Sequence, residues 1–291
     1  MIFINGASGN VGREVLSELR YKQIRYRVGL RAKDHNISAL NTNSVTFDLL
    51  DPTTFSSAIE GCTAVFLLRP PAISNTKATL NVFLDTAWRS GVEHVVFISV
   101  AGAASNPLVP HHAVEQHLMA GPASWTILRP GFFAQNLGDA YREDICNDSR
   151  IYVPAGSARV AFIDARDIAA VAVIALLNPA QHASKAYTLT GPQALSFAEV
   201  ANILTDTPGR PIIYQPASII GYIWHLMRRG LPLMQTCIIT ILHVGLRFGQ
   251  AKDINPTLKD LLPRKPYTVQ DYVSAHQALW SPSFMSTMVR L

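Results

Sequence analysis

The chain begins with a glycine-rich turn, and this turn constrains its fold more than any other feature. A short apolar run, Met1 to Ile4, leads into three glycines spaced G-x-x-G-x-x-G. Glycine lacks a Cβ, so the backbone can turn sharply, approach a ligand closely and pack tightly against a strand. Apolar residues then recur at helical spacing, which predicts an amphipathic helix with one face formed by Val11, Val15, Leu16 and Leu19.

A strand, a glycine turn and a helix in this order place a helix N-terminus beneath a pyrophosphate. A merely structural turn is the alternative, because many loops contain three glycines. The position between a strand and an amphipathic helix favours the ligand site. The sequence therefore predicts a dinucleotide site formed by Gly6, Ser8, Gly9, Asn10, Val11 and Gly12.

Composition narrows the class of protein. With 291 residues, 48% of them hydrophobic and 15% charged, the chain can bury a large core and does not have a disordered composition. The net charge of +5 is moderate, and Glu14 and Glu18 interrupt the early cluster of arginines and lysines. A solvated face is therefore a more ordinary interpretation of that cluster than a nucleic-acid surface. We expect a small-molecule substrate and no nucleic-acid partner.

The cysteines and the most apolar segment indicate the cellular compartment of the protein. Cys62, Cys146 and Cys237 are widely spaced and form no C-x-x-C motif, so they are interpreted as small buried residues in a reducing compartment. No signal peptide is recognised before the first strand. The stretch Leu231 to Leu246 is shorter than the roughly 20 residues of a membrane span. We expect it to line a pocket or cover a core in a cytoplasmic protein without a membrane span.

Strand and helix patterns alternate through the first half of the chain. This alternation predicts a parallel sheet with right-handed crossovers, helices on both faces and ligands at the carboxyl ends of the strands. Strands are expected near residues 24–30, 45–47, 64–68, 95–98 and 125–128, and helices near 52–60 and 76–89. The fold class is thus α/β, a doubly wound, Rossmann-like parallel sheet with a smaller, mostly helical C-terminal substrate lobe.

The pattern loosens after Arg129-Pro130. Helices are expected at 166–177 and 197–205, the second opened by a capping box of Ser196 and Glu199. From about residue 210 onward the chain is predicted to form apolar helices broken by Gly221, Gly230, Pro232 and Gly245. We therefore expect a cofactor-binding domain at 1–135 and, at 136–291, a mixed region that returns partly to the sheet and forms the substrate lobe.

Arg31 indicates which dinucleotide is bound. In an NAD site, an acidic residue at the end of the second strand binds the ribose hydroxyls of adenosine. Here the residue nineteen positions after Gly12 is Arg31, with Lys33 nearby and no carboxylate before Asp34. Cations at this place suit a 2′-phosphate, so the sequence favours NADPH over NADH. The alternative is an ordinary exposed arginine at a strand end.

Two further strand ends carry candidate cofactor residues. Asp48 follows the third strand, where adenine rings often lie, although it is equally interpretable as a helix cap before Pro52. Leu68, Arg69 and Pro70 follow the fourth strand, where the chain is expected to pass the pyrophosphate and ribose. The prolines fix the shape of that loop, so turn chemistry alone is the alternative.

Five segments resemble the NmrA-like group of atypical short-chain dehydrogenases/reductases. They are GASGNVG at 6–12, HHAVEQHL at 111–118, WTILRPGFFAQN at 125–136, FIDARDIA at 162–169 and LPRKPYTV at 262–269. The resemblance covers nearly the whole chain. It implies an NAD(P)-binding Rossmann fold and is less specific for the reaction, since the group includes NADPH-dependent quinone and imine reductases as well as regulators that only bind the nucleotide.

The resemblance also implies that Pro130, Gly131, Phe132 and Phe133 lie beside the nicotinamide, with Phe133 toward substrate. From the residues alone, the two phenylalanines are equally interpretable as core aromatics. Asn136 either donates to a substrate oxygen or caps a helix. Ser99, just past the fifth strand, falls where classical members place a catalytic hydroxyl, although a serine there is commonly a turn residue.

The catalytic pair of classical members is missing from the sequence. In Tyr-x-x-x-Lys, lysine lowers the pKa of tyrosine so that it can protonate a forming alkoxide. None of the nine tyrosines here has lysine four positions later. His112, whose residue type titrates near neutral pH, is our candidate proton donor instead. His111 and Glu115 have the i, i+4 spacing of metal ligands, but without a third ligand we expect no metal.

This absence narrows the expected chemistry. Reduction of an unactivated ketone forms a basic alkoxide and needs a placed acid, whereas an iminium ion, a quinone or a polarised enone does not. The sequence therefore predicts an NADPH-dependent reductase of an activated small-molecule acceptor. An apolar lid near Tyr222, Trp224, Met227 and Met234 is expected to cover the substrate, with Tyr222 and Trp224 as substrate residues. Core filling is the alternative interpretation of Trp224 and of the two methionines. The alternative is a non-enzymatic NADP(H) sensor that acts through a protein partner; the oligomeric state is left open.

Overall fold

The computed structural model describes residues 1–31, 43–206 and 210–280. The chain forms two compact units. Unit 1 comprises Met1–Pro130, Ala165–Leu189 and Asp260–Pro263, and unit 2 comprises Gly131–Asp164, Thr190–Lys259 and the described part of Arg264–Leu291. The chain thus leaves the first unit after residue 130 and returns to it twice, for the segment 165–189 and for the short segment 260–263.

Unit 1 is built around a parallel sheet of seven strands in the order β3-β2-β1-β4-β5-β6-β9. The order reverses between β1 and β4, so this is the switch point at which ligands bind in open α/β sheets. Their bounds are β1 Ile2–Ile4, β2 Tyr26–Leu30, β3 Ser44–Thr46, β4 Ala64–Leu68, β5 His94–Ile98, β6 Ser124–Pro130 and β9 Lys185–Leu189. The predicted Rossmann-like fold is confirmed.

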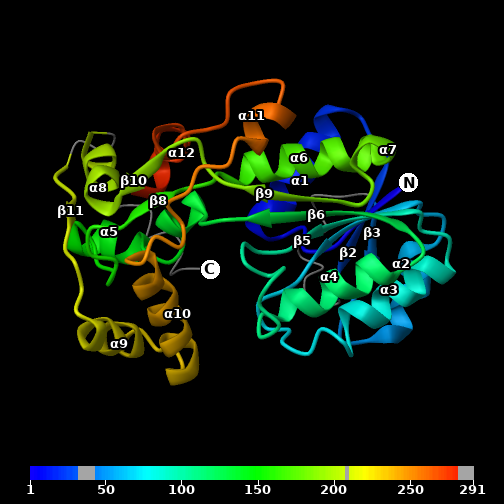
Figure 1. The fold of residues 1–291 in the computed structure, drawn as a ribbon, viewed down its shortest axis with the longest axis horizontal. Helices are drawn as coiled ribbons and strands as arrows, with labels where there is room; N and C mark the ends of the chain where they lie inside the picture. Colours follow the sequence, from blue (N-terminus) through cyan, green and yellow to red (C-terminus); the bar gives the residue numbers. More distant parts are fainter. Residues whose placement is uncertain (32–42, 207–209, 281–291) are drawn as a thin grey trace. The chain divides into compact units, whose positions relative to one another are not determined.

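Helices cover both faces of this sheet (Figure 1). On one face α1 packs along α6, and on the other α3 packs against α2 and α4. Aromatic rings of Phe3, Phe47, Phe55 and Phe83 meet in the core of the second face, with centroids 5.0 to 5.8 Å apart. The helices are α1 Asn10–Tyr21, the 3₁₀ turn η2 Pro52–Thr54, α2 Phe55–Ile59, α3 Leu80–Arg89, α4 Pro110–Ala120, α6 Ala165–Leu177 and α7 Pro179–His182.

Unit 2 is mostly helical. Its helices are η3 Ala134–Leu137, α5 Arg142–Asp148, α8 Phe197–Asp206, α9 Ile219–Arg228, α10 Leu233–Leu246, α11 Thr257–Leu261, whose end belongs to unit 1, α12 Val269–Ala275 and η4 Gln277–Trp280. Two small sheets join them, an antiparallel pair of β8 Arg159–Ala161 with β10 Ala194–Ser196 and a parallel pair of β7 Arg150–Ile151 with β11 Ile213–Tyr214. Phe162, Phe197 and Trp280 are fully buried in its core.

Several element bounds differ from the sequence-based expectation. The helix expected from Thr76 begins at Leu80, because residues 76–79 form turns and Thr76 Oγ1 donates to the carbonyl of Pro110. Gly221 and Gly245 lie inside α9 and α10 and do not break them; Gly230, with φ +82°, separates the two helices. The capping box is confirmed, since Glu199 N–H donates to Ser196 Oγ and Ser196 N–H donates to Glu199.

Within the described parts of the chain, no helix is both long and apolar enough to cross a membrane. Cys62 and Cys146 are buried, Cys237 is half-buried, and all three are free thiols.

Candidate functional site

The glycine turn joins β1 to α1 in unit 1. Gly6 has φ +69°, a left-handed conformation that favours glycine, and its carbonyl accepts a hydrogen bond of 3.0 Å from Gly9 N–H. A Cβ on Gly12 would lie 2.1 Å from the Gly6 oxygen. The first turn of α1 therefore packs directly on the loop, as a dinucleotide-binding turn requires.

The N-terminus of α1 is open to an anion. Its N-cap is Gly9, which makes no side-chain capping bond, and the first turn contains no acidic residue. Ser8 and Gly9 are exposed, and only the Gly6 oxygen, at 3.4 Å, lies near the place of a Cβ on Gly9. Uncapped amides at the positive end of a helix suit a phosphate, so these residues fit the pyrophosphate of a dinucleotide.

Asn5, which sequence reasoning missed, fixes the switch point. It is buried, its amide donates to the Leu68 carbonyl at 2.7 Å, and the Leu68 amide donates to its Oδ1 at 2.7 Å. These bonds join the carboxyl ends of β1 and β4, so Leu68 lies against the glycine turn. An amide next to the first glycine was the only signal in the sequence.

The two other strand-end predictions have different outcomes. Arg31 is exposed directly after β2, whose register pairs Val28 with Ile4 of β1, and Lys33 lies outside the described residues. Asp48 does not cap the 3₁₀ turn at Pro52, because the cap is Asp51, whose carboxylate accepts from Thr53 N–H at 3.1 Å. Asp48 instead accepts from Leu50 N–H in the loop after β3.

Arg69 organises the loop after β4. Its Nη1 donates to the carbonyls of Pro70, Pro71 and Ile73, and its Nε donates to His111 Nε2 at 3.1 Å. Burial and then the Arg69 charge lower the pKa of His111 to about 4, so the ring is neutral near pH 7 and accepts this bond. The guanidinium thus holds loop 69–73 against α4, a structural use that sequence alone did not indicate.

A buried ionic network lies at the carboxyl ends of β5 and β6. Arg129 makes a bidentate pair with Glu115, with Nε to Oε1 at 3.0 Å and Nη2 to Oε2 at 2.7 Å. Ser99 Oγ donates to the same carboxylate, and both Ser99 and Glu115 are almost completely buried. Since the Ser99 proton is committed to Glu115, the geometry supports a structural role for this hydroxyl more than a catalytic one. The network itself was missed, because fourteen positions separate the paired charges.

His112 is differently placed from His111. It is half-buried on the first turn of α4, and its Nδ1 lies 2.8 Å from the Ala103 carbonyl, the geometry of an Nδ1–H donor. Its Nε2 has no hydrogen-bond partner within the described ranges, so this atom remains available to a ligand. Groups of three or more side chains able to hold a metal ion are not found among the described residues.

The aromatic candidates that follow β6 lie in unit 2, after Pro130 ends the strand. Phe132 packs edge to face on Phe162, with ring centroids 5.5 Å apart, and on His243 at 6.0 Å. Phe133 forms a parallel bridge to Ile163 just before η3. Gly131, Phe132, Phe133 and Asn136 are all half-buried, so both the core and the ligand interpretations of these side chains stay open.

The structure does not bring Tyr222 and Trp224 onto one surface. Tyr222 is 3% exposed in the core of unit 2, and Trp224 is 65% exposed on the outer side of α9. The rings of Tyr222 and His243 pack with centroids 5.4 Å apart, and His243 accepts a hydrogen bond from the hydroxyl of buried Tyr141. This Tyr141–His243 pair was not found from the sequence, because 102 positions separate its members.

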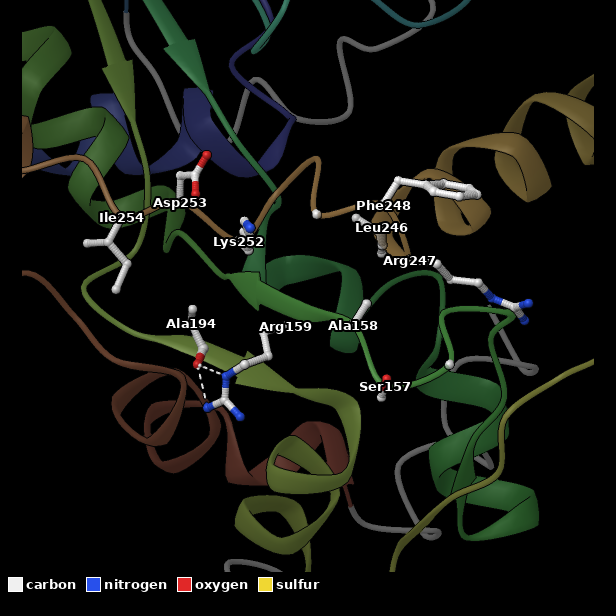
Figure 2. A pocket seen from close by; sticks show the side chains of 12 residues that line it. Ser157, Ala158, Arg159, Ala194, Leu246, Arg247, Phe248, Lys252, Asp253 and Ile254 are labelled. Atoms are coloured by element: carbon white, nitrogen blue, oxygen red, sulfur yellow. Dashed lines mark hydrogen bonds between the residues drawn. The ribbon is translucent and has the colours of Figure 1, made fainter.

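A cavity of about 880 Å³ also lies within unit 2 (Figure 2). None of the predicted substrate residues lines it. Arg159 turns toward the carbonyl of Ala194 and also pairs with Glu199, and Arg247 Nε donates to the Pro154 carbonyl. Both guanidinium groups are therefore bound to the walls of the cavity and do not converge on its centre.

Known proteins are similar to this chain over most of its length. A family model described as NAD(P)H-binding matches residues 6–179. NAD(P)H azoreductase of Xenophilus azovorans is 32% identical over 96% of this chain and 98% of its own length, and agroclavine dehydrogenase of Claviceps fusiformis is 29% identical over 96% and 98%. The structure of the NADPH-dependent quinone oxidoreductase QOR2 of Escherichia coli with NADPH aligns with TM-score 0.82 and 26% identity, covering 94% of this chain and 99% of that one.

These matches confirm the prediction of an NADPH-dependent oxidoreductase. The chain therefore belongs to the NAD(P)H-binding family as an oxidoreductase, and its fold is that of the NmrA-like atypical short-chain dehydrogenase/reductase group.

Proposed function

We propose that the protein is an NADPH-dependent reductase of conjugated, electron-poor small molecules, with quinones as the primary acceptors and azo compounds, iminium ions and enones as related ones. The observation that carries the proposal is the Ser99–Glu115–Arg129 network. It occupies the carboxyl ends of β5 and β6, where a ketone reductase would place a proton donor, with groups that already neutralise one another. Two relatives support it by name, an azoreductase and a quinone oxidoreductase.

The first part of the proposal concerns the cofactor. Residues 1–135 hold it, with its pyrophosphate on the residues of the glycine turn and on Leu68, Arg69 and Pro70 after β4. Arg31 and Lys33 bind the 2′-phosphate, and Asp48 lies near the adenine. Arg31 supports this assignment by its place at the carboxyl end of β2, next to β1 and its glycine turn. A guanidinium pairs with a phosphate through two parallel hydrogen bonds, which a nucleotide without the 2′-phosphate cannot accept.

The second part concerns hydride transfer. When bound, NADPH supplies a hydride to the acceptor. Pro130, Gly131 and Phe132 border the reacting face, and Phe133 and Asn136 contact the acceptor. Half-buried aromatic side chains hold a flat conjugated ring and exclude water from it, so the rate comes from proximity and orientation. Trp224 contributes from the exposed side of α9, and Tyr222 supports the pocket from behind.

The third part concerns the proton. Addition of hydride to a quinone leaves a phenolate, a stabilised anion that does not need an acid in the transition state. In its doubly protonated imidazolium form, His112 then delivers the proton of Nε2 to the phenolate and is left neutral, with Nδ1–H still donated to the Ala103 carbonyl. A simple ketone would form a far more basic alkoxide. We therefore expect the network and His112 together to serve quinones and not aliphatic ketones.

Single-turnover oxidation of NADPH tests the proposal. The protein is mixed with one equivalent of NADPH and then with a benzoquinone, an azo dye, a cyclic iminium ion or cyclohexanone, and the NADPH absorbance is followed. We expect the quinone to consume the cofactor and cyclohexanone to leave it unchanged. Rapid turnover of cyclohexanone without reaction of any conjugated acceptor would refute the acceptor class. Tight NADPH binding with no acceptor consumed would instead support a sensor.

A variant separates the role of His112 from the hydride step. His112→Gln keeps a hydrogen-bond donor near Ala103 but loses the titratable nitrogen. We expect this variant to reduce quinone at a rate within a few-fold of the parent. Its rate of enone reduction should fall at least tenfold, because the enolate that forms needs a proton sooner. Equal losses on both acceptors would show that His112 does not act as the proton donor.

A further inference from the structure

Helix α10 of unit 2 is amphipathic, but it buries its polar side and exposes its apolar side. Its polar residues Thr236, Thr240 and His243 are 0%, 3% and 7% exposed. Its apolar residues Met234, Ile238, Ile241 and Leu242 are 74%, 52%, 69% and 59% exposed. We name these four residues the apolar stripe. Helices of monomeric proteins bury the apolar side, so this helix indicates a contact that the isolated chain does not make.

The buried polar side is bonded in place, so the stripe cannot turn inward. His243 Nε2 accepts from the hydroxyl of Tyr141, and its Nδ1 lies 2.8 Å from the Ile239 carbonyl. Thr240 Oγ1 donates to the Thr236 carbonyl at 2.8 Å. The bonds to the Ile239 and Thr236 carbonyls lie within α10, whereas the Tyr141–His243 bond joins the helix to the core and would break if α10 rotated by half a turn. The outward orientation of the stripe is therefore a property of the folded unit.

The exposed apolar surface extends onto the neighbouring helix. Helices α9 and α10 lie side by side in unit 2 (Figure 1); Ile220 on α9 is 72% exposed, and Leu233 at the start of α10 is 59% exposed. Six such side chains, at roughly 100 to 150 Å² each, offer roughly 600 to 900 Å², which matches the roughly 800 Å² that one partner contributes to a standard interface.

We propose that the apolar stripe is the contact between two copies of this chain, packed as an antiparallel pair of α10 helices about a twofold axis. Within the stripe, residues 234, 238 and 241 are separated by four and three positions, the spacing of a seam between two packed helices. The 14 residues of α10 include no Asp, Glu, Lys or Arg, so a second copy meets the stripe without repulsion of like charges. A lipid surface fits less well, because the opposite side of the helix is embedded in protein and offers no row of cations.

Light scattering coupled to size-exclusion chromatography tests the proposal on the full chain at micromolar concentration. The chain has a mass of 31.9 kDa, and we expect the parent protein to elute at twice that value. Ile241→Glu introduces two charges at each twofold contact, so this variant is expected to elute as a monomer. Tyr21→Glu, at an 85% exposed position of α1 in unit 1, is the matched control and should remain dimeric.

A second variant distinguishes loss of the dimer from misfolding of a single variant. Ile238→Lys places the opposite charge on the same stripe, and circular dichroism with NADPH titration checks that both variants are folded. Mixing Ile241→Glu with Ile238→Lys should restore a dimer, because opposite charges then meet across the axis. Loss of dimer in both folded variants supports the proposal.

A monomeric parent protein, or a folded Ile241→Glu variant that remains dimeric, overturns the proposal. Flotation with phosphatidylcholine–phosphatidylglycerol vesicles identifies the rival occupant. A monomeric parent that floats with the vesicles, while Ile241→Glu does not, would assign the stripe to a lipid surface and would also refute the dimer.

Discussion

Gly12→Ala perturbs the turn that defines the cofactor site. Gly12 lies in the first turn of α1, and replacement of glycine by alanine inside a helix ordinarily stabilises a protein by about 0.5 to 1 kcal/mol. Here the added methyl group would lie 2.1 Å from the Gly6 oxygen, 2.7 Å from the Gly6 carbonyl carbon and 2.9 Å from the Ala7 Cα. All three are backbone atoms, so no side chain can move aside. Overpacking of this kind costs about 1 to 3 kcal/mol and must outweigh the helix gain.

Gly9→Ala is the matched substitution in the same motif. Gly9 has φ −80°, which alanine adopts freely, and its Cβ would meet only the Gly6 oxygen at 3.4 Å, an ordinary contact. We expect no loss of stability. The methyl group would nevertheless stand at the exposed N-cap of α1, where the pyrophosphate is proposed to bind. A steric cost of about 1 to 3 kcal/mol there corresponds to a roughly 5- to 150-fold higher dissociation constant for NADPH.

Urea unfolding of the cofactor-free protein and fluorescence titration with NADPH measure the two effects separately. We expect Gly12→Ala to lower the free energy of unfolding by about 2 kcal/mol. Gly9→Ala should leave that free energy within about 0.5 kcal/mol of the parent and weaken the binding of NADPH. A Gly12→Ala variant as stable as the parent would refute the packing argument. A Gly9→Ala variant with unchanged NADPH affinity would refute the placement of the pyrophosphate.

Three further predictions concern charged and titratable groups of unit 1. Arg31→Ala should raise the dissociation constant of NADPH by roughly 10- to 100-fold and leave that of NADH unchanged, because a charge-assisted bond contributes about 1.5 to 3 kcal/mol. The control is Arg25→Ala, before the same strand, which should change neither dissociation constant by more than a few-fold. Glu115→Ala leaves the Arg129 guanidinium buried without its carboxylate and should lower the free energy of unfolding by about 3 to 5 kcal/mol; a loss below about 1 kcal/mol in urea would contradict the buried pair. Burial and then His182 lower the pKa of His94 to about 4, so the folded state resists protonation and stability is lost as pH falls from about 6.5 toward 4, by up to about 3 kcal/mol. His94→Asn should flatten the urea midpoint between pH 6.5 and 4, and an unchanged slope would contradict this assignment.

The parts of unit 1 with strong local patterns were predictable from the sequence. The expected strand at 64–68 coincides with β4, because a continuous apolar run there is bounded by Gly61 and by Arg69-Pro70. The helix expected at 166–177 is α6, longer by one residue. The glycine turn was recognisable because its conformation depends on three closely spaced residues. These features need no information about distant parts of the chain.

What the sequence concealed depends on contacts between distant residues. Glu115 and Arg129 stand fourteen positions apart on a helix and a strand, and nothing local shows that they pair. The same holds for Tyr141 and His243. The two-residue strands β7 and β11 are too short to show a period of two. The orientation of α10 was equally hidden, because its sequence is apolar almost throughout, and the bond of His243 to the distant Tyr141 helps to fix which side faces inward.

The paired charges at the carboxyl ends of the strands also bear on why the acceptor should be a quinone. A lone carboxylate buried beside the acceptor would oppose the negative charge that hydride transfer creates, and in a medium of low dielectric this repulsion would be severe. Arg129 cancels the Glu115 charge through two hydrogen bonds, and Ser99 donates a third. The network after β5 and β6 is therefore close to neutral, and it supplies neither a strong acid nor an uncompensated positive charge. Such an environment suits an acceptor that delocalises its own developing charge, and it gives little help to one that does not.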